Sequence, residues 1–230
     1  MALGRREVML GMGAAGLGAA PPPDLGTLLA AVAARYAGLT CYTLGITHWR
    51  EMGGGRKTMR LVYGDEAHFR FEAPESVLVA DGDFCWQYRA EGREYLREPV
   101  GQVDARVRAE FNRLREQFVG RFRELPRLLP VARAMGEQRV PGTKLALPQI
   151  EIAPRDGAWL EHIWVDPVAA LVVQSAFSRL LTTQGRQWVY HRFAFQPDVD
   201  GAAFWFTPPA KARQVERFST PPVPIEAIPL

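Results

Sequence analysis

Apolar and polar residues alternate with a period of two over most of this chain. Phe69 and Phe71 alternate with Arg70 and Glu72, for example. This alternation is typical of strands that bury one face and expose the other. The segments with such strand character are 42–47, 59–63, 67–73, 77–80, 84–88, 145–152, 159–165, 171–177, 187–195 and 203–206. The sequence therefore predicts a large antiparallel sheet.

Short polar turns separate these strands. Glycine-containing turns at 53–55, 64–66 and 81–83 each lie between two alternating segments, as in hairpins. Asp166-Pro167 is predicted to join the strands before and after it. Pro148 interrupts the segment 145–152, and since proline donates no backbone hydrogen bond, an edge strand or a loop is expected there.

Two regions have helical spacing instead. Residues 25–36 carry an apolar stripe that Asp24 can cap and Gly38 can end. Residues 102–123 repeat apolar residues every three or four positions, and prolines bracket a second helical stretch over 126–135. Helices grouped in the middle of an antiparallel series predict an α+β fold, with one sheet wrapped around a helical element.

The N-terminal segment has the features of an export signal. Arg5 and Arg6 precede a weakly apolar stretch over 8–20, which ends at three prolines. An arginine pair before such a stretch resembles a twin-arginine signal, so a periplasmic location is expected. The glycines of this stretch spell G-x-G-x-x-G, but they lack the preceding strand that a nucleotide site needs. The expected organisation is a signal over 1–23, a domain over 24–218 and a proline-rich tail over 219–230.

The sequence lacks the motifs of common catalytic and metal sites. No G-x-S-x-G elbow, Walker A loop or H-E-x-x-H motif is present. We therefore predict no catalytic residues, no metal and no cofactor. An enzyme remains the least favoured alternative, and it would use His68 or His162. The net charge of +3 is small, without the basic stripe typical of nucleic-acid proteins, so no nucleic-acid partner is expected.

Two smaller features each leave alternatives open. Cys41 and Cys85 are either a disulfide of an oxidising compartment or two small buried thiols. The many arginines of 102–123 lie mostly off its apolar stripe. They form either a solvated face or a surface for a membrane or a partner protein.

Two segments resemble the LolA/LolB-like superfamily, which includes periplasmic carriers of lipoproteins. APESVLVADGDFCWQY over 73–88 has the superfamily's proline turn, apolar strand, Asp-Gly turn and W-x-Y strand. GAAFWFTPPAKARQV over 201–215 resembles its closing F-x-F-x-P-P strand. The two segments occur in the superfamily's order. This resemblance implies an incomplete antiparallel β-barrel with helices over its open side and an apolar cavity between them.

The same resemblance implies a binding function without catalysis. The expected ligand is a lipid, the acyl chain of a lipoprotein or another apolar molecule, with transient contact to a membrane surface. The alternative is an envelope module that binds a protein partner or senses stress. The carriers' basic residue before a proline is absent from the turn at 63–66, so hand-over between membranes is not implied. The residues expected to line the cavity are Leu44, Ile46, Leu61, Phe69, Phe71, Leu78, Phe84, Trp86, Tyr88, Phe118 and Phe122.

Overall fold

The computed structural model describes residues 24–51, 53, 55–103, 105–154, 157–181 and 185–219. The expected export signal and nearly all of the proline-rich tail lie outside these residues. Among the described residues, no helix combines the length and the apolar composition that spanning a bilayer requires.

The first half of the chain forms a six-stranded antiparallel meander. Each strand pairs with the next one along the chain. The strands are β1 (Tyr42–Arg50), β2 (Arg56–Tyr63), β3 (His68–Ala73), β4 (Ser76–Asp81), β5 (Phe84–Arg89) and β6 (Glu94–Pro99). The first five confirm the alternation predicted from the sequence. The strand β6 was not predicted.

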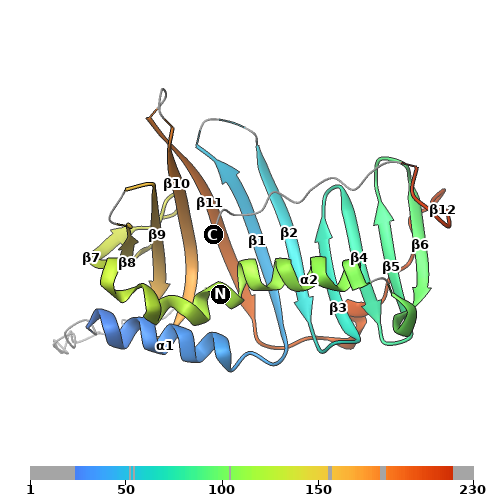
Figure 1. Ribbon diagram of the computed structural model, residues 1–230, viewed down its shortest axis with the longest axis horizontal. Coiled ribbons are helices and arrows are strands. Elements are labelled where there is room, and N and C mark those ends of the chain that lie inside the picture. The colour runs from blue at the N-terminus through green and yellow to red at the C-terminus, as the bar shows by residue number, and fades with distance from the viewer. Residues whose placement is uncertain are drawn as a thin grey trace, which may run out of the picture.

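The second half forms a second antiparallel meander. Its strands are β7 (Ala132–Arg139), β8 (Ala146–Ile152), β9 (Trp159–Asp166), β10 (Leu171–Leu181) and β11 (Gly185–Gln196). Strand β11 pairs with β1, which joins the two meanders into one sheet. With β12 (Arg213–Gln214), the strand order is β12-β6-β5-β4-β3-β2-β1-β11-β10-β9-β8-β7 (Figure 1). The sheet is open, which confirms the expected incomplete barrel.

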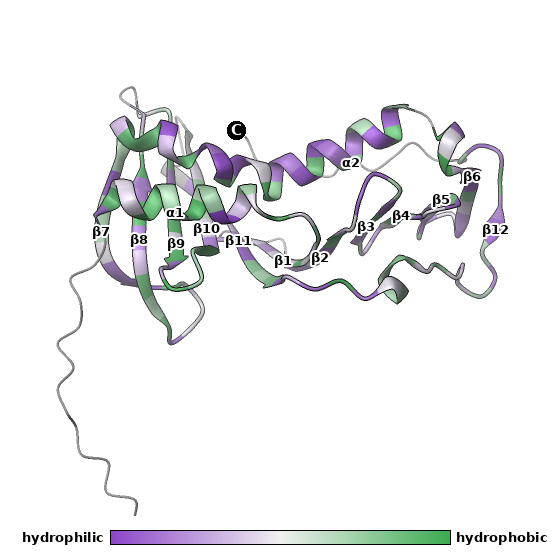
Figure 2. Cartoon of the chain, turned by 90° about the horizontal axis from the view of Figure 1, so that it is seen from below, coloured by the Kyte–Doolittle hydropathy of each residue, from purple (hydrophilic) through white to green (hydrophobic). Residues whose placement is uncertain are grey.

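Helices cover one face of this sheet. They are α1 (Leu25–Ala37), α2 (Ala105–Phe118) and the 3-10 helix η2 (Gly120–Val131), with a short η1 (Val100–Gln102) at the end of β6. Asp24 caps α1 as predicted, because its carboxylate accepts a hydrogen bond from the Thr27 amide at 3.1 Å. Figure 2 shows α1 and α2 on the same side of the sheet. We call this side the helix-covered face.

The middle helix is shorter than its spacing predicts. The α-helix ends at Phe118, and a 3-10 helix that contains Pro126 and Pro130 follows. Each proline lacks the amide that would continue an α-helical ladder. Residues 126–135 were expected to be helical throughout, but β7 begins at Ala132.

Pro148 lies in an inner strand rather than in an edge strand. Strand β8 pairs with β7 on one side and β9 on the other, but its pairing with β9 begins only at Gln149. Opposite Pro148, β7 has a register shift between Ala134 and Glu137, and Gly136 there has a positive φ of 71°. A bulge and the end of one ladder thus accommodate the missing proline donor.

The chain after β11 crosses the opposite face of the sheet. Residues 203–206 were predicted to be a strand, but they belong to the 3-10 helix η3 (Gly201–Phe204) and to extended chain after it. We call residues 201–206 the strap, and the side that it crosses the strap face (Figure 2). Arg70 on β3 donates hydrogen bonds to the carbonyl oxygens of Ala203 at 3.4 Å and Trp205 at 3.1 Å. Beyond the strap, β12 pairs in parallel with β6.

Candidate functional site

Most of the predicted cavity residues lie on the helix-covered face. Those on β1 to β3 are at most 4% exposed. They form one apolar cluster with side chains of the helices, and Leu78 packs against it. The predicted residues in this cluster are Leu44, Ile46, Leu61, Phe69, Phe71, Phe118 and Phe122. In the state described, helix side chains fill the space over these strands.

Three predicted cavity residues lie on the strap face instead. Cys85 belongs to the apolar cluster under the helices. Because side chains alternate along a strand, Phe84 and Trp86 on either side of Cys85 point to the strap face. Phe206 of the strap packs on Trp86 and Tyr88, with ring centroids 5.8 and 6.2 Å apart. Phe84 shares their side of β5, where Arg97 stacks on its ring at 3.6 Å. The prediction that Phe84, Trp86 and Tyr88 face the helices was wrong, because the strap gives this strand a second apolar side.

Helix α2 contacts the sheet through aromatic side chains near the ends of β2 and β3. Phe111 stacks on Phe69 with ring centroids 4.3 Å apart, and it also lies 6.4 Å from Tyr63. Arg108 fixes the start of the helix, since it donates hydrogen bonds to the carbonyl oxygens of Glu66 at 3.1 Å and Val100 at 2.5 Å. The contact between α2 and the sheet is therefore an aromatic stack that a guanidinium anchors at one end.

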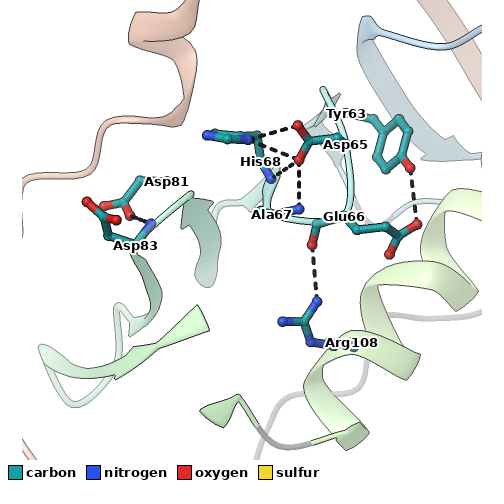
Figure 3. Close-up of polar contacts among 8 residues, drawn as sticks. All are labelled: Tyr63, Asp65, Glu66, Ala67, His68, Asp81, Asp83 and Arg108. Atoms are coloured by element: carbon teal, nitrogen blue, oxygen red, sulfur yellow. Dashed lines mark hydrogen bonds and ion pairs between the residues drawn. The ribbon is translucent and has the colours of Figure 1, made fainter. Parts of the chain in front are cut away.

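The turn between β2 and β3 is internally braced (Figure 3). Asp65 accepts hydrogen bonds from the amides of Ala67 at 2.7 Å and His68 at 2.8 Å, and its carboxylate lies 3.0 Å from the His68 ring. These amide bonds hold the pKa of Asp65 below its usual range. Tyr63 donates a hydrogen bond to Glu66 at 3.2 Å. The turn thus forms a fixed rim at this end of the sheet.

A pocket of about 390 Å³ opens between this rim and the helices. We call it the rim pocket. Residues from six segments line it, including the link between α1 and β1. Its lining residues are Leu39, Thr40, Tyr42, Tyr63, Gly64, Asp65, Glu66, Arg115 and Arg123. None of these residues was predicted to line a site. They come from separate segments, and helical spacing does not distinguish Arg115 and Arg123 from the other arginines of 102–123.

A second group of polar residues is buried deeper, beneath the junction of α2 and η2. His191 on β11 is 2% exposed, and its Nε2 lies 2.9 Å from Nδ1 of His48 on β1. Arg121 of η2 forms an ion pair with Glu161 on β9, which is 3% exposed. Burial raises the pKa of Glu161 above its ordinary value, and Arg121 opposes that shift. These polar groups lie within the apolar layer of the fold.

His191 is expected to make the protein less stable in mild acid. Burial, with His48 and Arg121 nearby, holds the His191 pKa well below 6.5. Below about pH 6.5 the unfolded chain therefore binds a proton that the folded chain excludes. The free energy of unfolding should fall with decreasing pH, by up to about 1.4 kcal/mol per pH unit. Urea unfolding from pH 7.5 to 5.0 should show a weaker dependence in His191→Phe than in the native chain.

His162→Phe is the matched control for that measurement. The His162 side chain is 22% exposed and lies beside Glu151 on the strap face. If His191→Phe and His162→Phe change the pH dependence equally, the buried pair with His48 is not its source.

The histidines considered for catalysis do not share a site. His68 borders a pocket of about 520 Å³ between the β3–β4 end and the strap. His162 lies in another cluster, with its ring 4.8 Å from that of Trp188. Within the described ranges, no group of three or more His, Cys, Asp or Glu side chains is placed to hold a metal ion.

Both cysteines are free thiols. Cys85 is buried, and burial raises its pKa to about 12. Cys41 is only partly buried, so the structure has two free thiols but only one of them is buried as the second alternative expected.

Solved structures similar to this one include a LolA superfamily protein from Nitrosomonas europaea, at 8% identity and a TM-score of 0.28. The match covers 78% of this chain and 96% of that one. A MucA/MucB complex from Pseudomonas aeruginosa matches at 17% identity and a TM-score of 0.44, over 87% of this chain and 67% of that one. A lipoprotein-sorting protein domain from Vibrio parahaemolyticus, described as putative, matches at 10% identity and a TM-score of 0.31, over 78% and 95% of the two chains.

The first of these structures belongs to the superfamily that the two sequence motifs resemble. No protein-family profile and no curated protein sequence matches the chain. Identities this low concern the fold alone.

Proposed function

We propose that the chain is a periplasmic binding protein that holds an apolar ligand, such as the acyl chain of a lipid or lipoprotein, between α2 and the helix-covered face of β1 to β4. The aromatic stack of Phe111 on Phe69 carries this proposal, because α2 closes an apolar sheet face through side chains. The periplasmic location is supported by the export features of residues 1–23.

The energies of opening and filling this space favour a long chain. Withdrawing Phe111, Leu114 and Phe118 from the sheet costs about 1.5–3 kcal/mol for each side chain. A sixteen-carbon chain supplies roughly 12 kcal/mol at about 0.8 kcal/mol per buried methylene, before the cost of ordering it. An acyl chain of this length can therefore replace the helix contacts, while a molecule with only a few apolar carbons cannot.

A narrow crevice marks where α2 would separate from the sheet. Its lining includes Phe69, Phe111 and Arg108. It lies beside the rim, so an opening there would lead from solvent to the apolar cluster. Arg108 holds this end closed through its two bonds to backbone carbonyls.

Loosening that anchor is expected to strengthen binding of a neutral apolar probe. In Arg108→Ala, α2 loses two charge-assisted hydrogen bonds, so the open state becomes more populated. We expect about tenfold tighter binding of N-phenyl-1-naphthylamine, equivalent to about 1.4 kcal/mol. The measurement is a fluorescence titration of the full chain.

Arg127→Ala is the matched control, since Arg127 on η2 is 83% exposed and pairs with Glu124. It should bind the probe as the native chain does. Failure of both the native chain and Arg108→Ala to take up the probe, while both remain folded, would contradict the proposed function.

The alternative function is a protein-interaction module. Its supporting observation is Trp205 of the strap, which is 76% exposed. A partner bound at the strap face would need no opening under α2. The probe titration therefore separates the two functions.

A further inference from the structure

We propose that the rim pocket binds the anionic headgroup, a carboxylate or a phosphate, of an amphiphile whose apolar chain passes under α2. This inference rests on the proposed function and assigns a chemical class to its ligand. Four features of the pocket support it: two buried donors without partners, two guanidinium groups, weak opposing carboxylates and an apolar floor.

The pocket is lined by hydrogen-bond donors that have no acceptor among the described residues. Tyr42 is 1% exposed, and its hydroxyl is buried without a hydrogen-bond partner in the described part of the chain. Nε of Arg115 is likewise buried without a hydrogen-bond partner among the described residues. Buried donors are rarely left without a partner in proteins. A ligand that accepts hydrogen bonds here would supply the partners that these two donors lack.

Two positive charges border the same space. The side chains of Arg115 and Arg123 are 18% and 33% exposed, so both guanidinium groups are partly shielded from water. Both influence the ionisation of Tyr42, and burial raises the pKa of Tyr42 above its usual value. The Tyr42 hydroxyl therefore stays protonated and can donate to an anion.

The carboxylates nearby compensate these charges only weakly. Glu66 lies 4.0 Å from Arg115, and Glu116 lies 3.8 Å from both arginines. Asp65 also lines the pocket, but its carboxylate accepts hydrogen bonds from amides of its own turn. The Glu66 and Glu116 side chains are 74% and 53% exposed, and ion pairs this long and solvated are weak. An anion at the pocket can compete with them, and charge-assisted, forked bonds from arginine suit carboxylate and phosphate oxygens.

The floor of the pocket is apolar and continuous with the core. Leu39 and Tyr42 belong to the apolar cluster under the helices. Tyr63 packs against that cluster, and the Arg115 guanidinium lies 4.5 Å from the centre of its ring. The pocket thus joins a cationic rim to an apolar interior, which matches an amphiphile better than a free inorganic anion.

The first experiment compares amphiphiles with the same chain and different headgroups. Palmitate, 1-palmitoyl-lysophosphatidic acid and neutral 1-palmitoylglycerol would each displace N-phenyl-1-naphthylamine from the full chain. We expect the two anionic compounds to bind about tenfold more tightly than the neutral one. Arg115→Gln should remove this preference, and Arg127→Gln, which changes an exposed arginine outside the pocket, should preserve it.

The outcomes separate this inference from the proposed function. Equal binding of anionic and neutral amphiphiles would overturn the headgroup assignment and leave the proposed function standing. If none of the three displaces the probe or binds directly, the proposed function fails and the assignment fails with it. Inorganic phosphate that binds as tightly as lysophosphatidic acid would overturn the assignment in favour of a free-anion site.

Tyr42→Phe supplies a test that does not depend on a general loss of folding. Removing an unpartnered buried hydroxyl should leave the melting temperature of the free protein unchanged or raise it. The same change should weaken binding of the anionic compounds several-fold and leave binding of 1-palmitoylglycerol unchanged. A lower melting temperature with an unchanged anionic preference would count against the proposal.

Discussion

Glu161→Leu is expected to lower the free energy of unfolding by about 3–5 kcal/mol. Arg121 then loses its carboxylate partner while its side chain remains only 12% exposed. Removing one member of a buried ion pair leaves a charge that neither water nor another group compensates. Urea unfolding of the native chain and the variant at pH 7.5 measures the difference.

The double variant Glu161→Leu with Arg121→Met is the control. Replacing both members by apolar residues of similar size removes the uncompensated charge, so most of the lost stability should return. If the double variant is less stable than Glu161→Leu alone, the unpaired charge is not the cause of the loss.

Phe118→Ala is expected to cost about 3–5 kcal/mol of stability and to improve binding of N-phenyl-1-naphthylamine. Phe118 is 1% exposed and packs among side chains of the helix-covered face, with its ring 5.9 Å from that of His191. Its removal forfeits apolar burial and leaves space where the proposed ligand chain would lie. Denaturant unfolding measures the first effect, and probe titration measures the second.

Phe204→Ala is the matched control on the opposite face. Phe204 is 7% exposed and lies in the strap, away from the cluster under the helices. Its loss should also destabilise the protein, without tighter binding of the probe. Equal gains in probe binding for both variants would show that any new space in the fold takes up the probe, and would remove this support for a site under α2.

The alternation of residues predicted most of the sheet but could not predict which way β5 faces. Phe84, Trp86 and Tyr88 are apolar, while Cys85, Gln87 and Arg89 are mostly polar, so the aromatic side was expected to face the helices. In the structure the aromatic side of β5 faces the strap instead, because Phe206, which is distant in sequence, packs on Trp86. A local pattern shows that two sides differ, but it does not show what covers each of them.

The rim pocket could be predicted less well than the core, for a related reason. Tyr42, Arg115 and Arg123 come from different elements, and the helix-to-3-10 transition after Phe118 determines where Arg123 lies. Helical periodicity treats the arginines of 102–123 alike. In the structure Arg115 and Arg121 are mostly buried, whereas Arg127 farther along is exposed.

The join between β1 and β11 has a consequence for folding kinetics. Within each meander, every strand pairs with its neighbour in sequence, so these contacts are local. The β1–β11 ladder instead joins positions such as His48 and His191, and it can form only after nearly the whole described chain is available. Loop closure makes it one of the costliest pairings to initiate. Until it forms, β1 and β11 are open strand edges, so conditions that delay this step favour pairing between different copies of the chain.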